Sequence, residues 1–523
     1  MAERSRLPRP ALPLRASDDV LASTRAETAL DRTLAALHRP VAAWALVAVV
    51  LLSLLTYRPP VDPDVFARVA VGRLIEANGG VVDQDPFAFT PKTERWIDHE
   101  WLSGVVLYRV ARLGGDSALL AFDLGMMLLT LALLVRAARE HSRERGINVL
   151  WLLVVMLPAF GIWVSVVRSR VFSFALLAWM LLMLVRWRHR AWWWICLVPP
   201  AFLLWANFHG GFVAGLGLLG IAAVAVTITD QGKSKALWGA LAASTLLTLV
   251  NPYGLDYWRY ILMAVTMERP GIVEWEALSV LSAHGALALV CALVFAAGGL
   301  VATRRPPPEA WALAATALLA AFSSQRILNF YWLILAVYGG PPATVLARRV
   351  QAWAPRWSAA AGRVATAGAL IAVPVLGAVI LRNLSQVARE GLGYEALPVE
   401  ATDWLLRSGG GGRLLVHFNH GSYALWRLYP HYQVSVDGRY EETYPQSTVN
   451  LGYDAITPGG PNHEAALVEV DPDYILLPDA AWASRFGPDW ERPYADERFA
   501  VLARSGLEPG AERPARPTWT PGF

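Results

Sequence analysis

Long apolar runs alternate with short polar connections along most of this chain. About eleven apolar segments lie between residues 41 and 381, and most of them are 15 to 24 residues long. An α-helix rises about 1.5 Å per residue and a bilayer core is about 30 Å thick, so runs of this length suit membrane crossing. The pattern predicts spans near 41–57, 117–136, 149–167, 171–187, 191–206, 211–229, 236–250, 279–302, 309–323, 327–346 and 364–381.

The connections between these runs fall into two chemical classes. One class is rich in Arg and Lys: RAAREHSRERG, RWRHR, DQGKSK, TRRPPPE and LARRVQAWAPR. The other is acidic, aromatic and amide-rich: VDPDVF, WIDHEW, RSR, NFHGG, NPYG, VEWE and SSQR. Basic loops stay on the cytoplasmic side of a membrane. We therefore expect the second class to gather on the outer face, where polar groups beside lipid usually mark function.

One apolar segment does not fit a simple crossing. The stretch WLSGVVLYRVARLGG, residues 101–115, carries Arg109 and Arg112. A full crossing here would place the basic loop 136–146 outside, against the charge pattern. We predict an interfacial or re-entrant helix that continues into the next span. About eleven spans, with 11 to 13 as the range, then leave the N-terminus in the cytoplasm and the C-terminus outside.

The composition changes along the chain and predicts three regions. Residues 1–40 are polar and rich in Arg and Pro, which is typical of a disordered cytoplasmic tail. Residues 41–385 form the membrane module, with a long external loop at 58–100. Residues 395–523 have a globular composition: GRLLVHF, YQVSVDGRY and PDYILLP read as strands, and EALPVEATDWLLRSG and NHEAALVEVD as helices. The predicted fold is mainly α, a polytopic transmembrane helix bundle with a C-terminal extracytoplasmic α/β domain.

The overall composition supports a membrane protein. Apolar residues make up 55% of the chain and charged residues 17%, whereas soluble domains are about a quarter charged. The formal charge of +4 follows from the Arg-rich cytoplasmic connections, so we expect no nucleic-acid partner. Cys196 and Cys291 both lie in apolar runs, which excludes a disulfide framework and a cysteine metal site.

The external loop carries the first candidate catalytic group. Residues 64–77 place apolar side chains on one face, which predicts a helix lying on the membrane surface. Asp64 begins this helix, and a partly desolvated carboxylate there could act as a general base. The alternative is that Asp62 and Asp64 only cap the helix.

A second acidic cluster ends the same loop. Asp98, His99 and Glu100 directly precede Trp101 and the next apolar segment. The cluster could orient a substrate, or Asp98 and Glu100 could bind a divalent metal, although the spacing is not a recognised ligand motif. The alternative is an ordinary interfacial rim with Trp96 and Trp101 as its anchors.

Three arginines occur at the outer ends of predicted spans, against the charge bias. Arg168 and Arg170 flank a serine between two spans, and Arg326 lies at the start of a later one. A cation in such a place either extends its head to water or pairs with an anion. The planar arginine fork is well suited to phosphate oxygens. We therefore predict that these arginines bind a phosphate.

Three further polar residues are expected on the same outer face. Asn207 and His209 occur in NFHGG at a helix end, and Glu274 occurs in VEWE. The collected groups suit a substrate with a lipid tail in the membrane and a phosphate head at its surface. The chain contains no P-loop and no dinucleotide-binding glycine motif placed between a strand and a helix.

The arrangement resembles the GT-C class of polytopic glycosyltransferases, which includes protein O-mannosyltransferases and aminoarabinose transferases. The likeness lies in a first span, an acidic residue soon after it in a long external loop, and an aromatic-acidic stretch before the next helix. The stretch GSYALWRLYP…VSVDGRYEETYP also resembles a domain of uncharacterised bacterial members. The chain has DPD where many members have Asp-Asp or Asp-Glu, and IDHEWL where the aminoarabinose branch has Glu-Lys-Pro-Pro.

This resemblance implies an enzyme of the bacterial inner membrane. The donor would be a polyprenyl-phosphate sugar, and the acceptor a hydroxyl of a lipid, glycan or protein. Asp64 would be the base of an inverting transfer, with Arg168, Arg170 or Arg326 holding the departing phosphate. No redox cofactor is implied, and a divalent metal stays open.

Two other classes of function fit the same polar loops. One is a flippase or transporter of a lipid carrier, and the other is a non-catalytic membrane assembly protein. Against a transporter, the predicted spans lack the charged or Gly/Pro-broken pairs expected at the membrane midplane. The C-terminal region could bind the acceptor or cover the cavity, and its notable polar residues are His417, Asn419, His420, Asp437 and Arg439. We expect Asp437 and Arg439 to pair locally, and the alternative is that they contact a substrate.

Overall fold

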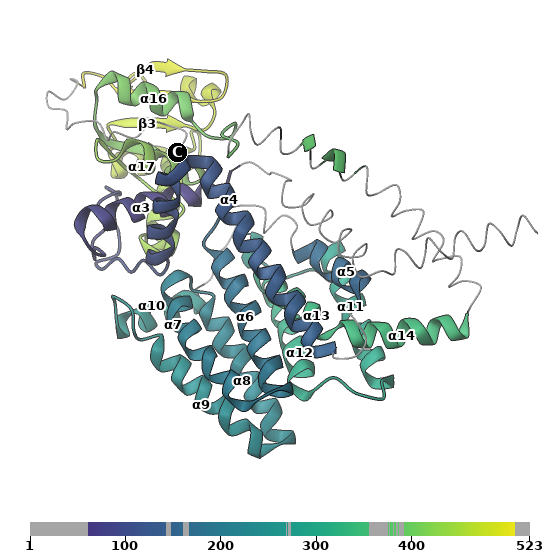
Figure 1. Cartoon of the computed structure of the whole chain (residues 1–523). Coiled ribbons are helices and arrows are strands. Elements are labelled where there is room, and N and C mark those ends of the chain that lie inside the picture. The colour runs from purple at the N-terminus through teal and green to yellow at the C-terminus, as the bar shows by residue number, and fades with distance from the viewer. Residues whose placement is uncertain are drawn as a thin grey trace, which may run out of the picture.

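The chain forms a bundle of long helices with a mixed α/β domain at one end (Figure 1). This computed structural model describes residues 61–142, 148–159, 167–267, 269, 273–354, a few residues of 375–385, and 392–507. The predicted tail 1–40, the predicted span 41–57 and most of the span 364–381 lie outside the described residues.

The helical bundle is built around α6, which is buried along most of its length. Its helices are α4 (Trp101–Ser142), α5 (Val149–Ala159), α6 (Arg170–His189), α7 (Val198–Phe208), α8 (Phe212–Thr229), α9 (Gln231–Leu247), α10 (Leu255–Thr266), α11 (Ala283–Val301), α12 (Pro308–Ser323), α13 (Leu328–Tyr338) and α14 (Gly340–Trp353). Short 3-10 turns η1 (Trp192–Leu197), η2 (Val273–Trp275) and η3 (Gln325–Ile327) join some of them.

Within the described residues, four helices are long and apolar enough to cross a membrane: α4, α6, α8 and α11. The pair η3–α13 and α14 passes the same test together, with a bend of 66° between its parts. The predicted span 327–346 is therefore bent, because the chain turns at Gly339. The other apolar helices are shorter, and the number eleven stays a prediction. Helix α10 was not predicted.

The segment 101–115 does continue into the next helix, as its charges indicated. Helix α4 runs for 42 residues and is interrupted at Gly114 and Gly115, where the backbone leaves the helical region. Gly115 has φ +60°, a conformation that glycine adopts without strain. The part before this break packs against α3 (Asp64–Asn78) at Gly104 and Gly72. A side chain on Gly72 would collide with the Gly104 carbonyl, so both glycines are needed for the close approach.

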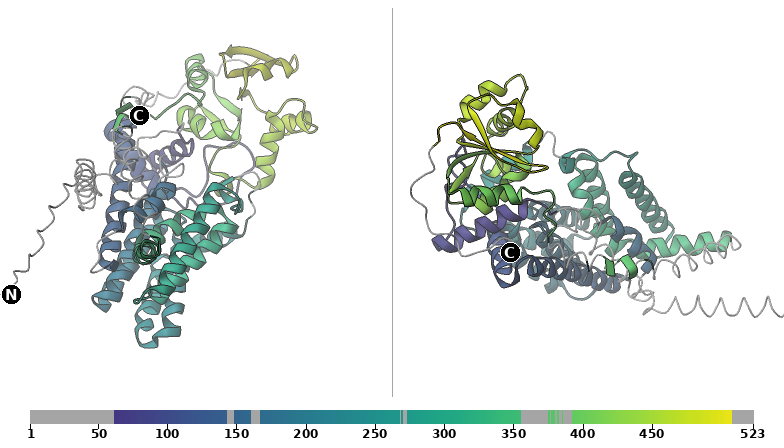
Figure 2. Two further views of the ribbon diagram at one scale, coloured as in Figure 1. Left: turned by 90° about the vertical axis from the view of Figure 1, so that its right-hand side faces the viewer. Right: turned by 90° about the horizontal axis from the view of Figure 1, so that it is seen from above.

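Helix α3 has the predicted extent, and its apolar residues pack against protein, while its expected place on the membrane surface stays a prediction. The helix lies between α4 and the C-terminal helix α17 (Phe418–Leu428), as the view from above shows (Figure 2), and most of its side chains are buried. Phe66 lies 5.0 Å from the ring of Tyr423 and 5.2 Å from that of Trp426. The helix carries small and apolar residues on more than one face, so protein rather than lipid covers it.

The C-terminal domain has a five-stranded sheet in the order β2-β1-β3-β5-β4. Strand β1 (Gly412–Val416) pairs in parallel with β2 (Tyr432–Val434) and β3 (Tyr474–Leu477), and β5 (Ala500–Arg504) is antiparallel to β3 and to β4 (Trp490–Ala495). Its helices are α16 (Val399–Ser408), α17, α18 (Gln446–Ile456) and α19 (His463–Val470). The predicted β1, β2, β3, α16 and α19 are confirmed, although β2 is shorter. The other elements were not predicted.

The external loop after α3 extends the sheet of this domain. Ala88 forms a parallel bridge with Val434 of β2. The Phe89 amide donates to the Val434 carbonyl at 3.2 Å, and the Val434 amide donates to the Phe87 carbonyl at 2.9 Å. This pairing places the end of the loop, residues 98–100, beside the turn η4 (Tyr440–Glu442).

The basic connections meet one another within the bundle. Arg186 pairs with Glu140 at 3.0 Å, and Arg188 donates to Glu309 at 2.8 Å. Arg349 donates to the Val301 carbonyl at 3.0 Å. The two chemical classes of connection are thus separated in space, as the sequence pattern predicted.

Candidate functional site

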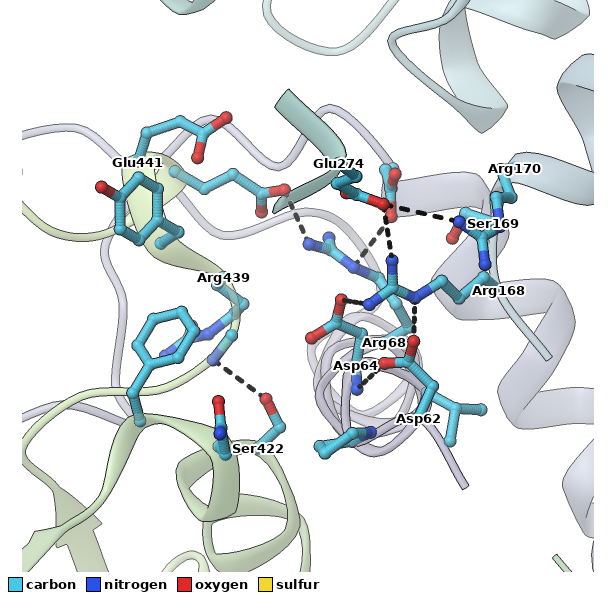
Figure 3. A pocket seen from close by; sticks show the side chains of 18 of the residues that line it. Asp62, Asp64, Arg68, Arg168, Ser169, Arg170, Glu274, Ser422, Arg439 and Glu441 are labelled. Atoms are coloured by element: carbon cyan, nitrogen blue, oxygen red, sulfur yellow. Dashed lines mark hydrogen bonds and ion pairs between the residues drawn. The ribbon is translucent and has the colours of Figure 1, made fainter. Parts of the chain in front are cut away.

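A cavity of about 630 Å³ lies where the helical bundle meets the C-terminal domain (Figure 3). Nine of the eleven residues singled out from the sequence line it: Asp62, Asp64, His99, Glu100, Arg168, Arg170, His209, Glu274 and Arg326. They come from the start of α3, the end of the external loop, the start of α6, the α7–α8 turn, η2 and η3. Asp98 and Asn207 do not line it.

Asp64 faces into this cavity from the first turn of α3. Its carboxylate lies 2.8 Å from Arg168, and 38% of its side chain is exposed to the cavity. Asp62 caps the start of this helix, because its Oδ1 accepts a hydrogen bond from the Asp64 amide at 3.0 Å. Asp62 also pairs with Arg168. Burial within the protein raises the pKa of Asp64 to about 7, while Arg168 opposes the shift and Asp62 adds to it.

One wall of the cavity is cationic. Arg168 and Arg170 each lie 3.6 Å from the same carboxylate oxygen of Glu274, and Arg326 lies 3.9 Å from the other. The guanidinium of Arg326 also stacks 4.8 Å above the ring of Trp275. Three guanidinium groups converge on the Glu274 carboxylate, and Arg168 also pairs with Asp62 and Asp64. Because an arginine fork is well suited to phosphate oxygens, this wall is a candidate site for an anion.

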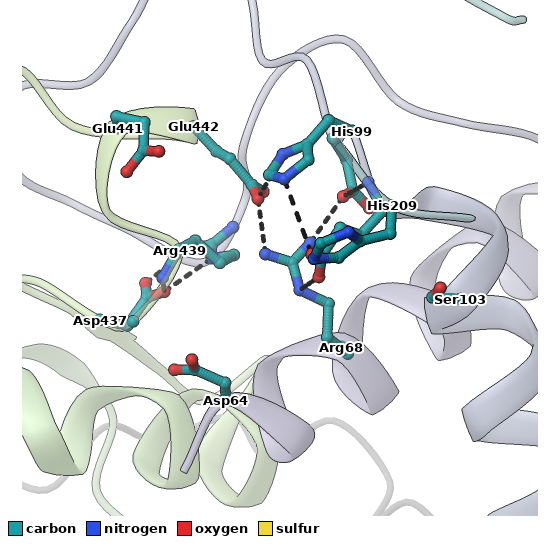
Figure 4. Close-up of polar contacts among 12 residues, drawn as sticks. Asp64, Arg68, His99, Ser103, His209, Asp437, Arg439, Glu441 and Glu442 are labelled. Atoms are coloured by element: carbon teal, nitrogen blue, oxygen red, sulfur yellow. Dashed lines mark hydrogen bonds and ion pairs between the residues drawn. The ribbon is translucent and has the colours of Figure 1, made fainter. Parts of the chain in front are cut away.

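A second cluster is centred on Arg68, one helical turn after Asp64 (Figure 4). Its three nitrogens pair with Asp98 at 2.6 Å, Glu100 at 3.0 Å and Glu442 of the C-terminal domain at 2.6 Å. Burial raises the pKa of Asp98 to about 6, and Arg68 opposes this. Burial alone would also raise the pKa of Glu100, but Arg68 holds it below the usual range.

The contacts of this cluster decide whether Asp98 and Glu100 are arranged to bind a divalent metal. Asp98 Oδ1 and Glu100 Oε2 both bind the guanidinium of Arg68. This guanidinium occupies the position that a metal ion between the two carboxylates would need. Among the residues that the structure describes, no group of three His, Cys, Asp or Glu side chains is arranged to hold a metal ion. The donor set does not fit a metal centred on Asp98 and Glu100.

Two histidines flank the carboxylates of this cluster. His99 Nδ1 lies 2.8 Å from Glu442 Oε1. Burial alone would lower the pKa of His99, but Glu442 raises it above the usual value. His209 Nδ1 accepts from the Gly211 amide at 2.9 Å, so its Nε2 carries the proton and points toward Glu100 at 3.4 Å. Burial lowers the pKa of His209 to about 3, so it is neutral.

Asn207 has a structural place rather than one in the cavity. Its Oδ1 accepts from Trp101 Nε1 at 2.9 Å, and its amide nitrogen donates to the carbonyls of Leu203 and Val250. These bonds tie α4 and α7 to the end of α9. Asn251 caps the turn after α9, because its Oδ1 accepts from the Tyr253 amide at 2.8 Å.

Of the cavity residues that the C-terminal domain supplies, Asn419 and Arg439 stood out in the sequence. Sequence reasoning missed the others, which are Phe418, Ser422, Gly438, Tyr440, Glu441, Glu442 and Tyr453. It also missed Arg68 and Arg269; Arg269 pairs with Glu441 at 2.6 Å. Arg68 did carry a signal, because a cation inside the run VFARVAVG needs a buried partner. The expected pairing of Arg439 with Asp437 is confirmed at 2.7 Å.

The fold that holds this cavity also occurs in solved structures. No protein-family model and no curated protein matches the chain. Among solved structures, the apo oligosaccharyltransferase of Archaeoglobus fulgidus is similar with a TM-score of 0.53, at 10% identity over 85% of this chain and 70% of that one. ArnT from Cupriavidus metallidurans in the apo state also gives 0.53, at 15% identity over 90% and 98% of the two chains.

The chain has a GT-C fold. A structure of the same ArnT bound to undecaprenyl phosphate gives a TM-score of 0.50, at 14% identity over 90% of this chain and 99% of that one. At these identities the similarity establishes the fold of polytopic membrane glycosyltransferases. In this GT-C fold, the cavity lies between the helical bundle and the C-terminal domain, with Asp64 and the three arginines facing into it.

Proposed function

We propose that the chain is an inverting glycosyltransferase that moves a sugar from a polyprenyl-phosphate donor to an acceptor hydroxyl. One observation carries the proposal: a carboxylate with a pKa near 7 lies at the edge of a wall of three arginines in the same cavity. A base and an anion site side by side are what this displacement requires. The undecaprenyl phosphate bound to the ArnT structure supports a lipid-linked donor.

The chemistry follows from the position of Asp64 beside the three arginines. Asp64 takes the proton of the acceptor hydroxyl as its oxygen forms a bond to the anomeric carbon. The bond from that carbon to the phosphate oxygen breaks on the opposite face, and polyprenyl phosphate leaves. Arg168, Arg170 and Arg326 stabilise the negative charge that develops on this leaving group. A single displacement of this kind inverts the anomeric centre.

The other carboxylates of the cavity have different tasks. Glu100 and Glu442 are bound to Arg68, and Glu441 is bound to Arg269. The pKa values of Glu100 and Glu442 lie below the usual range, which makes these carboxylates weak bases and weak nucleophiles, whereas the pKa of Asp64 is raised although it contacts Arg168. This difference favours Asp64 as the base and disfavours a covalent glycosyl-enzyme intermediate on Glu100 or Glu442. The outer face of the bacterial inner membrane is the location that we propose, on the strength of the separated basic and acidic connections.

The test is an Asp64→Asn variant of the full chain in lipid nanodiscs. Undecaprenyl phosphate linked to mannose, glucose or arabinose serves as donor, and released undecaprenyl phosphate is measured. We expect release to fall by 10²-fold or more in Asp64→Asn and to be unchanged in Asp83→Asn, a control on an exposed part of the same loop. Equal release by Asp64→Asn and the native chain would overturn the assignment.

The same preparation separates the transporter hypothesis. Movement of a fluorescent polyprenyl-phosphate sugar between leaflets, without release of polyprenyl phosphate from any donor, would replace our proposal by a flippase. The polar residues gather at helix ends in one cavity and not along the interior of the spans, which favours the enzyme.

A further inference from the structure

The C-terminal domain gives the cavity a second wall of a different chemical kind. Phe418 and Asn419 begin α17, Tyr440 lies in η4, and Tyr453 lies in α18. Three aromatic rings and a primary amide thus line the side that the domain supplies. The arginines that face Glu274 come from the helical bundle instead.

The rings of this wall are held in a fixed arrangement. Phe418 meets Tyr440 edge to face at 5.8 Å and lies nearly parallel to Tyr453, at 6.2 Å with an angle of 26°. Tyr440 has φ +42°, and its hydroxyl donates to the side chain of Gln446. A non-glycine residue in that conformation is held by its surroundings. The ring of Tyr453 keeps 40% of its surface exposed.

The charged groups on this side already have partners. Arg439 is bound to Asp437 and Asp85, Glu441 to Arg269, and Glu442 to Arg68 and His99. A phosphate or an amine would need a charge of opposite sign that could turn toward it. The groups that this wall exposes are Tyr453, part of Phe418 and the amide of Asn419, which can both donate and accept a hydrogen bond, whereas Tyr440 is only 7% exposed.

The wall is also close to the proposed base. Gly438 follows the buried Asp437, and its amide donates to Ser422 Oγ at 3.0 Å. Gly438 lies so near Asp64 that any side chain there would collide with the Asp64 carboxylate. Ser422 is one turn further along α17 than Phe418 and Asn419. A ligand on the aromatic wall could therefore present a group to Asp64.

We propose that Phe418, Asn419, Tyr440 and Tyr453 form a subsite for a neutral pyranose ring, so that a saccharide is bound at this wall. The C–H face of a sugar packs on aromatic rings, and its hydroxyls hydrogen-bond to an amide. This inference rests on the proposed function for its place in a reaction. The ring belongs either to the acceptor or to the sugar of the donor, and the experiment distinguishes the two.

The experiment measures sugar binding apart from catalysis. Saturation-transfer NMR is recorded on the full chain in nanodiscs with methyl glycosides of mannose, glucose, galactose and N-acetylglucosamine. We expect at least one glycoside to bind, and Tyr453→Ala and Asn419→Ala each to weaken it about tenfold. Both side chains are exposed, so their replacement leaves the domain core intact. Val468→Ala, an exposed change on α19, is the matched control.

The outcomes separate this subsite from the proposed reaction. Binding retained in Asp64→Asn but lost in Tyr453→Ala supports the subsite, whatever the result of the release assay. No binding of any glycoside, or equal binding by Tyr453→Ala and Val468→Ala, overturns it. Farnesyl phosphate and farnesyl phosphate mannose identify the source. If the wall holds the donor sugar, Tyr453→Ala weakens only the mannose-bearing lipid; if it holds the acceptor, neither lipid is affected.

Discussion

Replacement of Arg68 by methionine tests how the two parts of the protein are joined at the cavity. The guanidinium pairs with three carboxylates, two from the external loop and Glu442 from the C-terminal domain, and only 8% of the side chain is exposed. Methionine keeps the length and removes the charge. Asp98, Glu100 and Glu442 would then repel one another in a buried place, with His99 as their nearest cation.

The expected cost follows from this burial. Removal of one partner from a buried ion pair costs about 3–5 kcal/mol, because the charge left behind is desolvated. At roughly 2–4 °C per kcal/mol for a unit of 150–250 residues, the unfolding temperature of the external part should fall by about 6–20 °C. Arg73→Met is the matched control: it lies on the same helix and makes one 3.3 Å bond to the Trp426 carbonyl, a loss of about 1 kcal/mol.

The stability lost in Arg68→Met should also depend on pH. The pKa of Asp98 is about 6 with Arg68 present, and removal of Arg68 raises it further. A carboxyl group whose pKa is higher in the folded state favours folding as the pH falls through that pKa. The stability of the variant should therefore be closest to that of the native chain near pH 5 and furthest below it near pH 8.

The assay is tryptophan fluorescence during thermal unfolding of the full chain in detergent. A double-mutant cycle with Glu442→Gln should give a coupling of about 1–3 kcal/mol, since the two side chains contact each other. If Arg68→Met costs no more than Arg73→Met, or if the two changes of the cycle are additive within about 0.5 kcal/mol, the reasoning is refuted.

Three further predictions concern the reaction. Release of polyprenyl phosphate should rise with pH through about 7, because Asp64 acts only when ionised; a flat profile from pH 5.5 to 8.5 would contradict this. Arg326→Ala should weaken undecaprenyl phosphate binding about 10- to 100-fold in a fluorescence titration, whereas the exposed Arg109→Ala should not. Gly438→Ala should lower release by tenfold or more at unchanged unfolding temperature, because the added methyl group displaces Asp64.

Much of the cavity could be predicted because its parts lie at helix ends. A span delivers its ends to one face or the other, and the Arg and Lys content of the connections indicates which face. This logic alone brought together Asp64, Arg168, His209 and Arg326, which are separated by up to 262 residues in the sequence.

The rest depended on contacts that no local pattern records. Arg68 and Glu442 are 374 residues apart, and their pairing exists only because residues 87–89 join the edge of β2. Helix α3 was placed at the membrane surface because its apolar face had no known partner, and α17 is that partner. Strand β4 was missed because its polar residues are mostly exposed and Pro493 interrupts the pattern.

The most direct test of the central claim is a structure of this chain with undecaprenyl phosphate bound in a nanodisc. The account predicts the phosphate within hydrogen-bond distance of at least two of Arg168, Arg170 and Arg326, with the Asp64 carboxylate facing the adjoining space. A phosphate bound instead among Arg136, Arg139 and Arg190 at the other end of the bundle would contradict it.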